Sequence, residues 1–236
     1  MKLSSRRMSD IHARLAAAAR VEQQTDAAVL AFYRDLAAGA LARGQLRQWG
    51  PNYVWSVDQF KRTLAAVYAN CPEPDVREHL VENLWEEHGE GQPGRDHATL
   101  ANRFGTALGL SADDLDAFEP IAEARAWIDR LLEICQHEHF VVGLAAVGYG
   151  VEHGSPRIMR WIGETFRDRY GVDASDLEFF FHHIEADEVH AERMTRFIER
   201  YADTPELRDR CEWAVREVAT ATRAYAQGMA RIGAAV

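Results

Sequence analysis

Helical periodicity runs through almost every segment of this chain and constrains its fold more than any other feature of the sequence. Apolar residues recur three or four positions apart, and we find no period-two alternation that would predict a strand. The expected helical segments are 10–43, 45–70 with a kink at Gly50-Pro51, 73–88, 97–109, 121–149, 156–170, 176–201 and 205–231. We therefore predict an all-α fold, a single-domain helical bundle of about seven to eight helices over residues 1–236, with residues 1–9 disordered.

Charge and cysteine content exclude several classes of protein. The chain has 37 acidic against 27 basic residues, a net charge of −10, which argues against a nucleic-acid-binding protein. Its three cysteines, Cys71, Cys135 and Cys211, are far apart and indicate neither a disulfide framework nor a zinc knuckle. No apolar run is long enough to span a membrane, and no secretory signal is evident, so we expect a soluble, cytoplasmic protein.

The segment 177–200, LEFFFHHIEADEVHAERMTRFIER, places polar residues on a helix face that should be buried. At about 100° per residue, His183, Asp187 and His190 fall in one sector, and the row continues to Met194 and Phe197. Burying three polar groups is costly unless each has a partner. A metal ion shared with a neighbouring helix is one such partner, and a hydrogen-bonded His–Asp–His core network is the alternative.

The segment 73–88 offers a carboxylate to the same interior. Its apolar face is formed by Val76, Leu80, Val81, Leu84 and Trp85. Glu87 falls on this face, whereas Glu82 and Glu86 fall off it, so we expect Glu87 to be buried and the other two to be solvated.

Two further candidates follow in the chain. His97 opens the helix after the break GEGQPG (89–94) and could turn back towards Glu87, with a plain loop histidine as the alternative. Glu152 ends the nearly uniformly apolar segment 139–152, and a solvated helix end is the alternative there. The full candidate set is three carboxylates and three imidazoles, Glu87, His97, Glu152, His183, Asp187 and His190. Such ligands suit two iron or manganese ions.

These segments resemble the haem-oxygenase-like di-metal oxidases, whose fold is also that of the TenA and PqqC proteins. Within that superfamily, the chain is most similar to the group of the Chlamydia protein associating with death domains and its p-aminobenzoate-forming relatives. The resemblance extends over residues 25–225 and is carried by FYRDLAAGALARGQL (32–46), ENLWEEHG (82–89), HATLANRFGTALGLSADDLDAFEP (97–120), E-x3-PRI (152–158) and HHIEADEVHAE (182–192). It implies metal ligands at the same six positions.

The sequence departs from this group at two places. The group has six residues between the first Glu and the His, whereas nine separate Glu87 from His97, and the excess falls in GEGQPG. The p-aminobenzoate-forming relatives consume one of their own tyrosines, at the position of Tyr33, and depend on a lysine at the position of Ile162. Tyr33 is thus the candidate catalytic residue, with a core tyrosine as the alternative.

The resemblance implies a non-haem di-iron oxidase or oxygenase, with Fe/Mn as a variant. Its cofactors would be two Fe(II), with O2 as co-substrate and an external reductant. It would oxidise a small-molecule substrate of the amine, amino-acid or carboxylic-acid type. The alternatives are a self-sacrificing p-aminobenzoate synthase using Tyr33, a metal-independent TenA-like hydrolase and a helical interaction module. We expect no nucleic-acid or membrane partner, and the sequence is compatible with a homodimer.

Overall fold

The computed structural model describes residues 3–20 and 27–234, with their side chains except those of 3–9 and 185–188. The described residues form helices and no strand, which confirms the all-α prediction. The α-helices are α1 (Leu3–Ala18), α2 (Ala27–Ala37), α3 (Arg43–Asn70), α4 (Pro74–Glu87), α5 (His97–Ala107), α6 (Ala112–Asp116), α7 (Ala122–His137), α8 (Phe140–Gly148), α9 (Ser155–Tyr170), α10 (Glu178–Tyr201) and α11 (Pro205–Gly233). Three 3-10 turns lie between them, η1 (Gly89–Gly91), η2 (Glu152–Gly154) and η3 (Ala174–Leu177).

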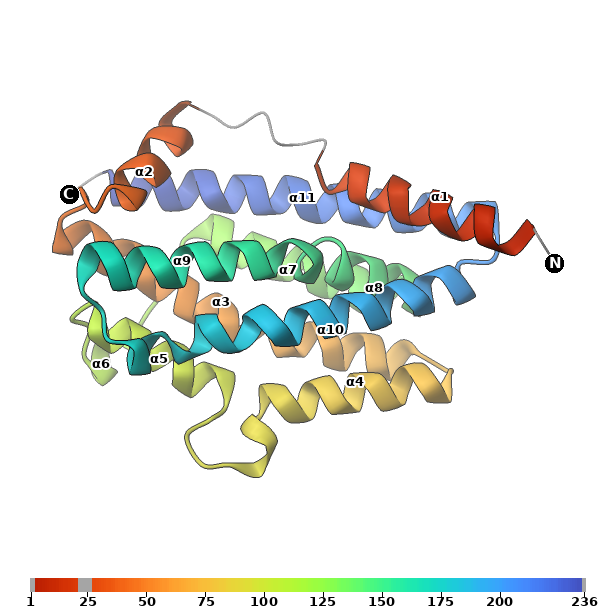
Figure 1. The fold of residues 1–236 in the computed structure, drawn as a ribbon, viewed down its shortest axis with the longest axis horizontal. Coiled ribbons are helices and arrows are strands. Elements are labelled where there is room, and N and C mark those ends of the chain that lie inside the picture. The colour runs from red at the N-terminus through yellow and green to blue at the C-terminus, as the bar shows by residue number, and fades with distance from the viewer. Residues whose placement is uncertain (1–2, 21–26, 235–236) are drawn as a thin grey trace.

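The helices form a bundle elongated along the direction of its longest members. Figure 1 shows α9, α10 and α11 running along this axis, with α1 beside α11 and α4 beside α10. Helix α8 lies inside the bundle, where α3, α7, α10 and α11 all pack against it. None of the described helices combines the length and the apolar composition needed to cross a lipid bilayer.

The structure divides the chain more finely than the periodicity predicted. The segment 121–149 is two helices, because Glu138 has an extended conformation and His139 caps α8 by accepting from the backbone N–H of Val141. The segment 10–43 contains two helices, α1 and α2, and the short α6 is additional. Helix α3 continues through Pro51. Helix α1 begins at Leu3, inside the stretch 1–9 that we expected to be disordered.

Two groups of buried side chains make the core. One surrounds α8, all nine residues of which are buried, and includes Leu64, Leu131 and Val215 from neighbouring helices. The other is rich in aromatic rings, including Phe104, Phe166 and Phe180. It lies between α3 and α5. These helices pack so closely that a Cβ on Gly50 would come within 2.4 Å of the Leu108 side chain, which follows α5. The second group borders the residues considered below as a metal centre.

Truncation of Leu144 tests the first core group. Leu144 lies on α8 and is fully buried, so we expect Leu144→Ala to lower the free energy of unfolding by about 2–5 kcal/mol. Val81 on α4 is 50% exposed, and Val81→Ala should change it by no more than about 0.5 kcal/mol. Urea denaturation followed by circular dichroism measures both. Equal effects of the two substitutions would contradict the position of α8 at the centre.

Candidate metal centre

The loop between α4 and α5 brings Glu87 and His97 together. Gly89 has a φ of +76°, and a Cβ there would meet the backbone nitrogen of Asp96 at 2.5 Å, so the two ends of the loop are in close contact. Asp96 then caps α5 by accepting from the N–H of Thr99 at 2.9 Å, and His97 becomes the first residue of that helix. The last residue of α4 therefore lies beside the first residue of α5.

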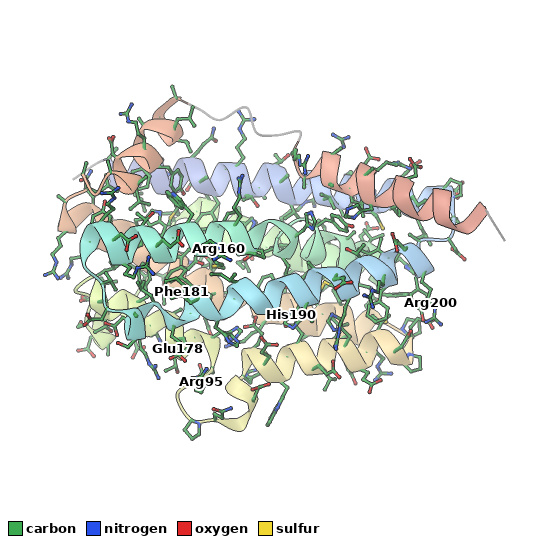
Figure 2. All side chains as sticks on the ribbon, viewed as in Figure 1. Arg95, Arg160, Glu178, Phe181, His190 and Arg200 are labelled. Carbon is green, nitrogen blue, oxygen red and sulfur yellow. The ribbon has the colours of Figure 1, made fainter. Side chains whose placement is uncertain are left out.

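The loop is also fastened to the start of α10. Arg95 and Arg103 both donate to the carboxylate of Glu178, and Arg103 also donates to the carbonyl of Gly94 at 2.7 Å. Figure 2 labels Arg95 in the loop and Glu178 at the first turn of α10 next to it. Helices α4, α5 and α10 thus meet at one place, where α10 presents His183.

Glu87, His97 and His183 form a buried cluster of potential metal ligands. Each side chain offers one ligand atom within 4.8 Å of the others. The Nδ1 of His97 lies 2.8 Å from Oε2 of Glu87, and the rings of His97 and His183 are 4.3 Å apart. All three residues are buried, as the sequence predicted for Glu87 and His183.

The orientation of His183 is fixed by the backbone. Its Nδ1 lies 2.7 Å from the carbonyl oxygen of Phe179, and since a carbonyl only accepts, Nδ1 carries the proton. This tautomer leaves the Nε2 lone pair for a metal ion. Burial, with the nearby His97, lowers the pKa of His183 to about 4, so the ring is neutral at pH 7.

Two observations bear on whether this cluster suits a metal ion. Burial opposes ionisation of Glu87, yet its contact with His97 brings the pKa of the carboxyl below its ordinary value. Within the described part of the chain, neither ring nitrogen of His97 has an aligned hydrogen-bond partner. Buried polar nitrogens without partners are costly, and a cation between carboxylate and imidazole would satisfy them. The donor set therefore fits a divalent metal.

A second group lies beside the first and corrects the expectation for Glu86. This carboxylate is half-buried, with Oε1 lying 3.2 Å from Nε2 of His182 and Oε2 lying 3.1 Å from Nε2 of His190. The two imidazoles hold the pKa of Glu86 far below its usual range, and Glu86 raises the pKa of His182. His190 lies on the side of α10 that faces α4 (Figure 2). The prediction of a solvated Glu86 was wrong.

The error came from the apolar face assigned to α4. Val81 and Trp85, which helped to define that face, are 50% and 56% exposed. Two polar residues, His79 and Asn83, are buried in their place. The buried face of α4 is therefore rotated about the helix axis from the face that we predicted. Glu82, also expected to be solvated, is exposed and pairs with Arg193.

His79 and Asn83 escaped the sequence analysis although both are almost fully buried. The ring of His79 contacts those of His190 and Phe197, at 5.8 Å and 5.7 Å between centroids. Burial and the neighbouring His190 lower its pKa to about 4. Neither its ring nitrogens nor Nδ2 of Asn83 has a hydrogen-bond partner within the described residues. The signal available in the sequence was their spacing, since His79 lies eight residues and Asn83 four residues before Glu87 on one helical face.

The remaining predicted ligands occupy different positions in the structure. Glu152 is buried in η2, which packs against α10, but it does not join either close ligand group among the described residues. The backbone of Asp187 lies in α10 one turn after His183, and its side chain lies outside the described residues. The structure therefore groups His97 with Glu87 and His183 on one side and with Glu86 and His182 on the other, while His190 contacts Glu86.

Tyr33 lies on α2 in the aromatic part of the core. Its ring meets Phe32 and Trp161 edge-on, at 5.2 Å and 6.0 Å between centroids. Burial raises the pKa of the Tyr33 hydroxyl, and the neighbouring Trp49 offsets part of the rise. Ile162, which follows Trp161 on α9, is buried in the same core group. The surroundings of Tyr33 are thus mainly apolar.

A series of aromatic rings leads from Trp49, beside Tyr33, to the ligand cluster. Trp49 stacks on Tyr53 at 5.6 Å, and Tyr53 meets Phe179 edge-on at 6.2 Å. Phe179 in turn lies 4.1 Å from the ring of His183. These rings form an apolar wall on one side of the cluster.

Comparisons with known proteins identify the family of the chain. The family model described as iron-containing redox enzyme matches residues 47–225, a span that includes all six predicted ligand positions but not Tyr33. The 4-aminobenzoate synthase of Chlamydia trachomatis is 30% identical over 169 residues, 71% of each chain. The 4-aminobenzoate synthase of Nitrosomonas europaea is 30% identical over 209 residues, 84% of this chain and 83% of the relative.

A solved structure shows the same fold. A CADD-like protein of unknown function from Nostoc punctiforme superimposes with a TM-score of 0.77 at 16% identity, covering 95% of this chain and 97% of the other. At this identity the likeness supports the fold alone, and it agrees with the haem-oxygenase-like architecture expected from the sequence.

Substitution of Gly89 tests the loop that joins the two ligands. Gly89→Ala should destabilise the protein by clearly more than the roughly 1–2 kcal/mol cost of a left-handed alanine, because its Cβ meets backbone atoms. Gly94 is the matched control, since its φ is also +76° but a Cβ there finds only the Arg103 guanidinium at 3.5 Å. Chemical denaturation of the metal-free chain measures both. Equal destabilisation would show that the loop ends are not in contact.

Proposed function

Because the chain belongs to the family of iron-containing redox enzymes, we propose that it is a non-haem di-iron oxidase that uses O2 to oxidise a small metabolite. The observation that carries the proposal is the buried cluster of Glu87, His97 and His183. Oxygen and nitrogen ligands of this kind suit Fe(II), with an Fe/Mn pair as a variant. When bound, two ferrous ions would supply electrons for the activation of O2, and an external reductant would restore them.

The proposed ligand set is the one expected from the sequence. Glu87, His97 and His183 would hold metal in the buried cluster. Glu152 on η2 and the pair Asp187 and His190, further along α10, would complete the two sites. Support for the last group comes from helical spacing and from the burial of Glu152 on η2, which packs against α10.

The protein's own groups would prepare this centre in three ways. The carbonyl of Phe179 keeps the proton of His183 on Nδ1. Glu86 accepts from His182 and His190 and so orients His190. The wall containing Phe179 and Tyr53 would limit the access of water from the side facing α3.

The cysteines argue against a TenA-like hydrolase with a thiol nucleophile. Burial raises the pKa of both Cys135 and Cys211 to about 12, and it also raises the pKa of Cys71. A nucleophilic cysteine instead needs a lowered pKa, because the thiolate is the reactive form. None of the three takes part in the ligand groups found among the described residues.

A second candidate function, 4-aminobenzoate formation from Tyr33, is favoured by the names of two relatives. The p-aminobenzoate-forming proteins that the sequence resembles depend on a lysine at the position of Ile162. Ile162 is buried and has no amine. The lysines of the chain are Lys2 and Lys61, and Nζ of Lys61 lies 2.7 Å from Asp58. We therefore favour an external substrate.

Metal analysis tests the ligand set. After anaerobic reconstitution we expect about two Fe per chain, and Glu87→Ala and His183→Ala should each lose at least half of the bound metal. Glu86→Ala is the matched control: it should weaken metal binding by about 10–100-fold but keep the stoichiometry at saturation, because Glu86 orients a ligand. Atomic emission spectroscopy after gel filtration measures the number of metal ions bound per chain in each protein.

Two results would contradict this assignment. Stoichiometric zinc in a folded sample that takes up neither Fe nor Mn would count against the di-iron proposal. Loss of metal in Glu86→Ala with retention in Glu87→Ala would show that the longer loop has moved the ligand by one residue.

Turnover experiments distinguish the external substrate from Tyr33. With Fe(II), reductant and O2, oxidation of an external amine or acid should exceed one turnover per chain. Tyr33→Phe should slow it by about tenfold, or about 1.4 kcal/mol, through loss of the hydroxyl beside Trp49. Mass spectrometry of the intact chain provides the control. A specific loss of mass at Tyr33, with product limited to one per chain and abolished in an iron-loaded Tyr33→Phe protein, would establish the second candidate instead.

A further inference from the structure

A cavity on the opposite side of α10 from α4 has the features of an anion-binding site. Its volume is about 540 Å³, within the range of about 300–1,000 Å³ typical of sites for small molecules. Its lining comes from four elements, of which η2 and α9 are consecutive in the chain: α1 supplies His12, η2 supplies His153, α9 supplies Arg157 and Arg160, and α10 supplies Thr195. In Figure 2, Arg160 is labelled on α9 next to α10.

The two arginines give the cavity its positive charge. Arg157 and Arg160 are three residues apart, so they project from the same side of α9. Within the described residues neither pairs with a carboxylate, whereas Arg167 on the same helix pairs with Asp168. The acidic residue of the lining, Glu192, is engaged by Arg196. These two exposed guanidinium groups give this part of the surface a local positive charge on a chain whose net charge is −10.

The start of α9 adds to this charge. The helix is 16 residues long and begins beside the cavity, where its N-cap, Gly154, has no side chain to cap the first turn. A Cβ on Gly154 would meet nothing within 4 Å, so the helix end is open. In the first turn the Ser155 N–H already donates to the Glu152 carbonyl and Pro156 has no N–H, so the contribution of this helix end to anion binding is chiefly the positive end of its dipole.

A buried tyrosine holds the imidazoles of the lining in place. Tyr149 is 3% exposed, and its hydroxyl contacts Nδ1 of His12 and lies 3.1 Å from Oγ1 of Thr195. The ring of His153 stacks on Tyr149 at 5.1 Å. Pro156 and Ala191 add apolar surface to the lining. The cavity thus combines fixed polar groups with room for a hydrocarbon skeleton.

We propose that this cavity binds a small organic anion through a carboxylate or phosphate group held by Arg157 and Arg160. The planar guanidinium groups match the oxygens of either anion. The site goes beyond the proposed oxidase function and does not require it. Its lining directly adjoins two of the proposed metal ligands in sequence, since Glu152 precedes His153 and His190 precedes Ala191.

Isothermal titration calorimetry of the full chain, at one fixed ionic strength, tests the site with benzoate and with inorganic phosphate as probes. We expect saturable binding of at least one, weakened at least tenfold in the double variant Arg157→Gln/Arg160→Gln. Arg167→Gln is the matched control and should bind as the parent does, because Arg167 is exposed and already paired. Tighter binding of benzoate assigns a carboxylate ligand, and tighter binding of phosphate assigns a phosphorylated one. Equal melting temperatures of the proteins verify that each is folded.

A third variant separates this cavity from the metal centre. His183→Ala should retain anion binding, whatever its effect on metal content. Binding lost in His183→Ala but kept in the double arginine variant would place the anion at the metal centre and overturn the proposal. Absence of saturable binding of both probes to the folded parent, or equal binding of neutral benzamide and benzoate, would overturn it as well.

Discussion

The contact between Glu87 and His97 is the interaction on which the candidate metal centre depends. It joins the last residue of α4 to the first residue of α5 at 2.8 Å, in a place where both side chains are buried. A buried carboxylate is stable as an ion only with a positive or hydrogen-bonding partner. His183 adds a neutral imidazole whose proton is already committed to the backbone. Three helices therefore bring together buried nitrogen and oxygen atoms that do not all find hydrogen-bond partners within the cluster.

The burial of His183 on α10 was predictable because it depends on the geometry of one regular helix. His183 and Met194 are buried, as a row at about 100° per residue requires. The prediction was less successful on α4, where it assumed that large apolar residues mark the inward face. Trp85 lies instead outside, over the η1 turn, within 3.0 Å of where a Cβ of Gly91 would be. The sequence pattern cannot distinguish an apolar side chain in the core from one that covers a loop.

Features that depend on several elements could not be read from the sequence. The break between α7 and α8 follows from the extended conformation of Glu138, without a glycine or proline to signal it. The contact of His12 with Tyr149 joins residues 137 positions apart. The aromatic rings between Trp49 and Phe179 come from α3 and α10, and only packing aligns them. Local patterns therefore predicted helices and ligand candidates, whereas pockets and neighbours required the tertiary structure.

The close approach of Gly89 to Asp96 has a consequence for how this site tolerates change. Since these two residues are in contact, the segment between them is a surface loop whose ends lie side by side. The length of this loop does not affect the separation of Glu87 from His97. Glu90 and Gln92, within the loop, are exposed. Insertions and deletions can accumulate there without moving either side chain. Sequence spacing between the two residues is consequently a poor guide to their distance in space, and proteins with shorter loops can build the same cluster.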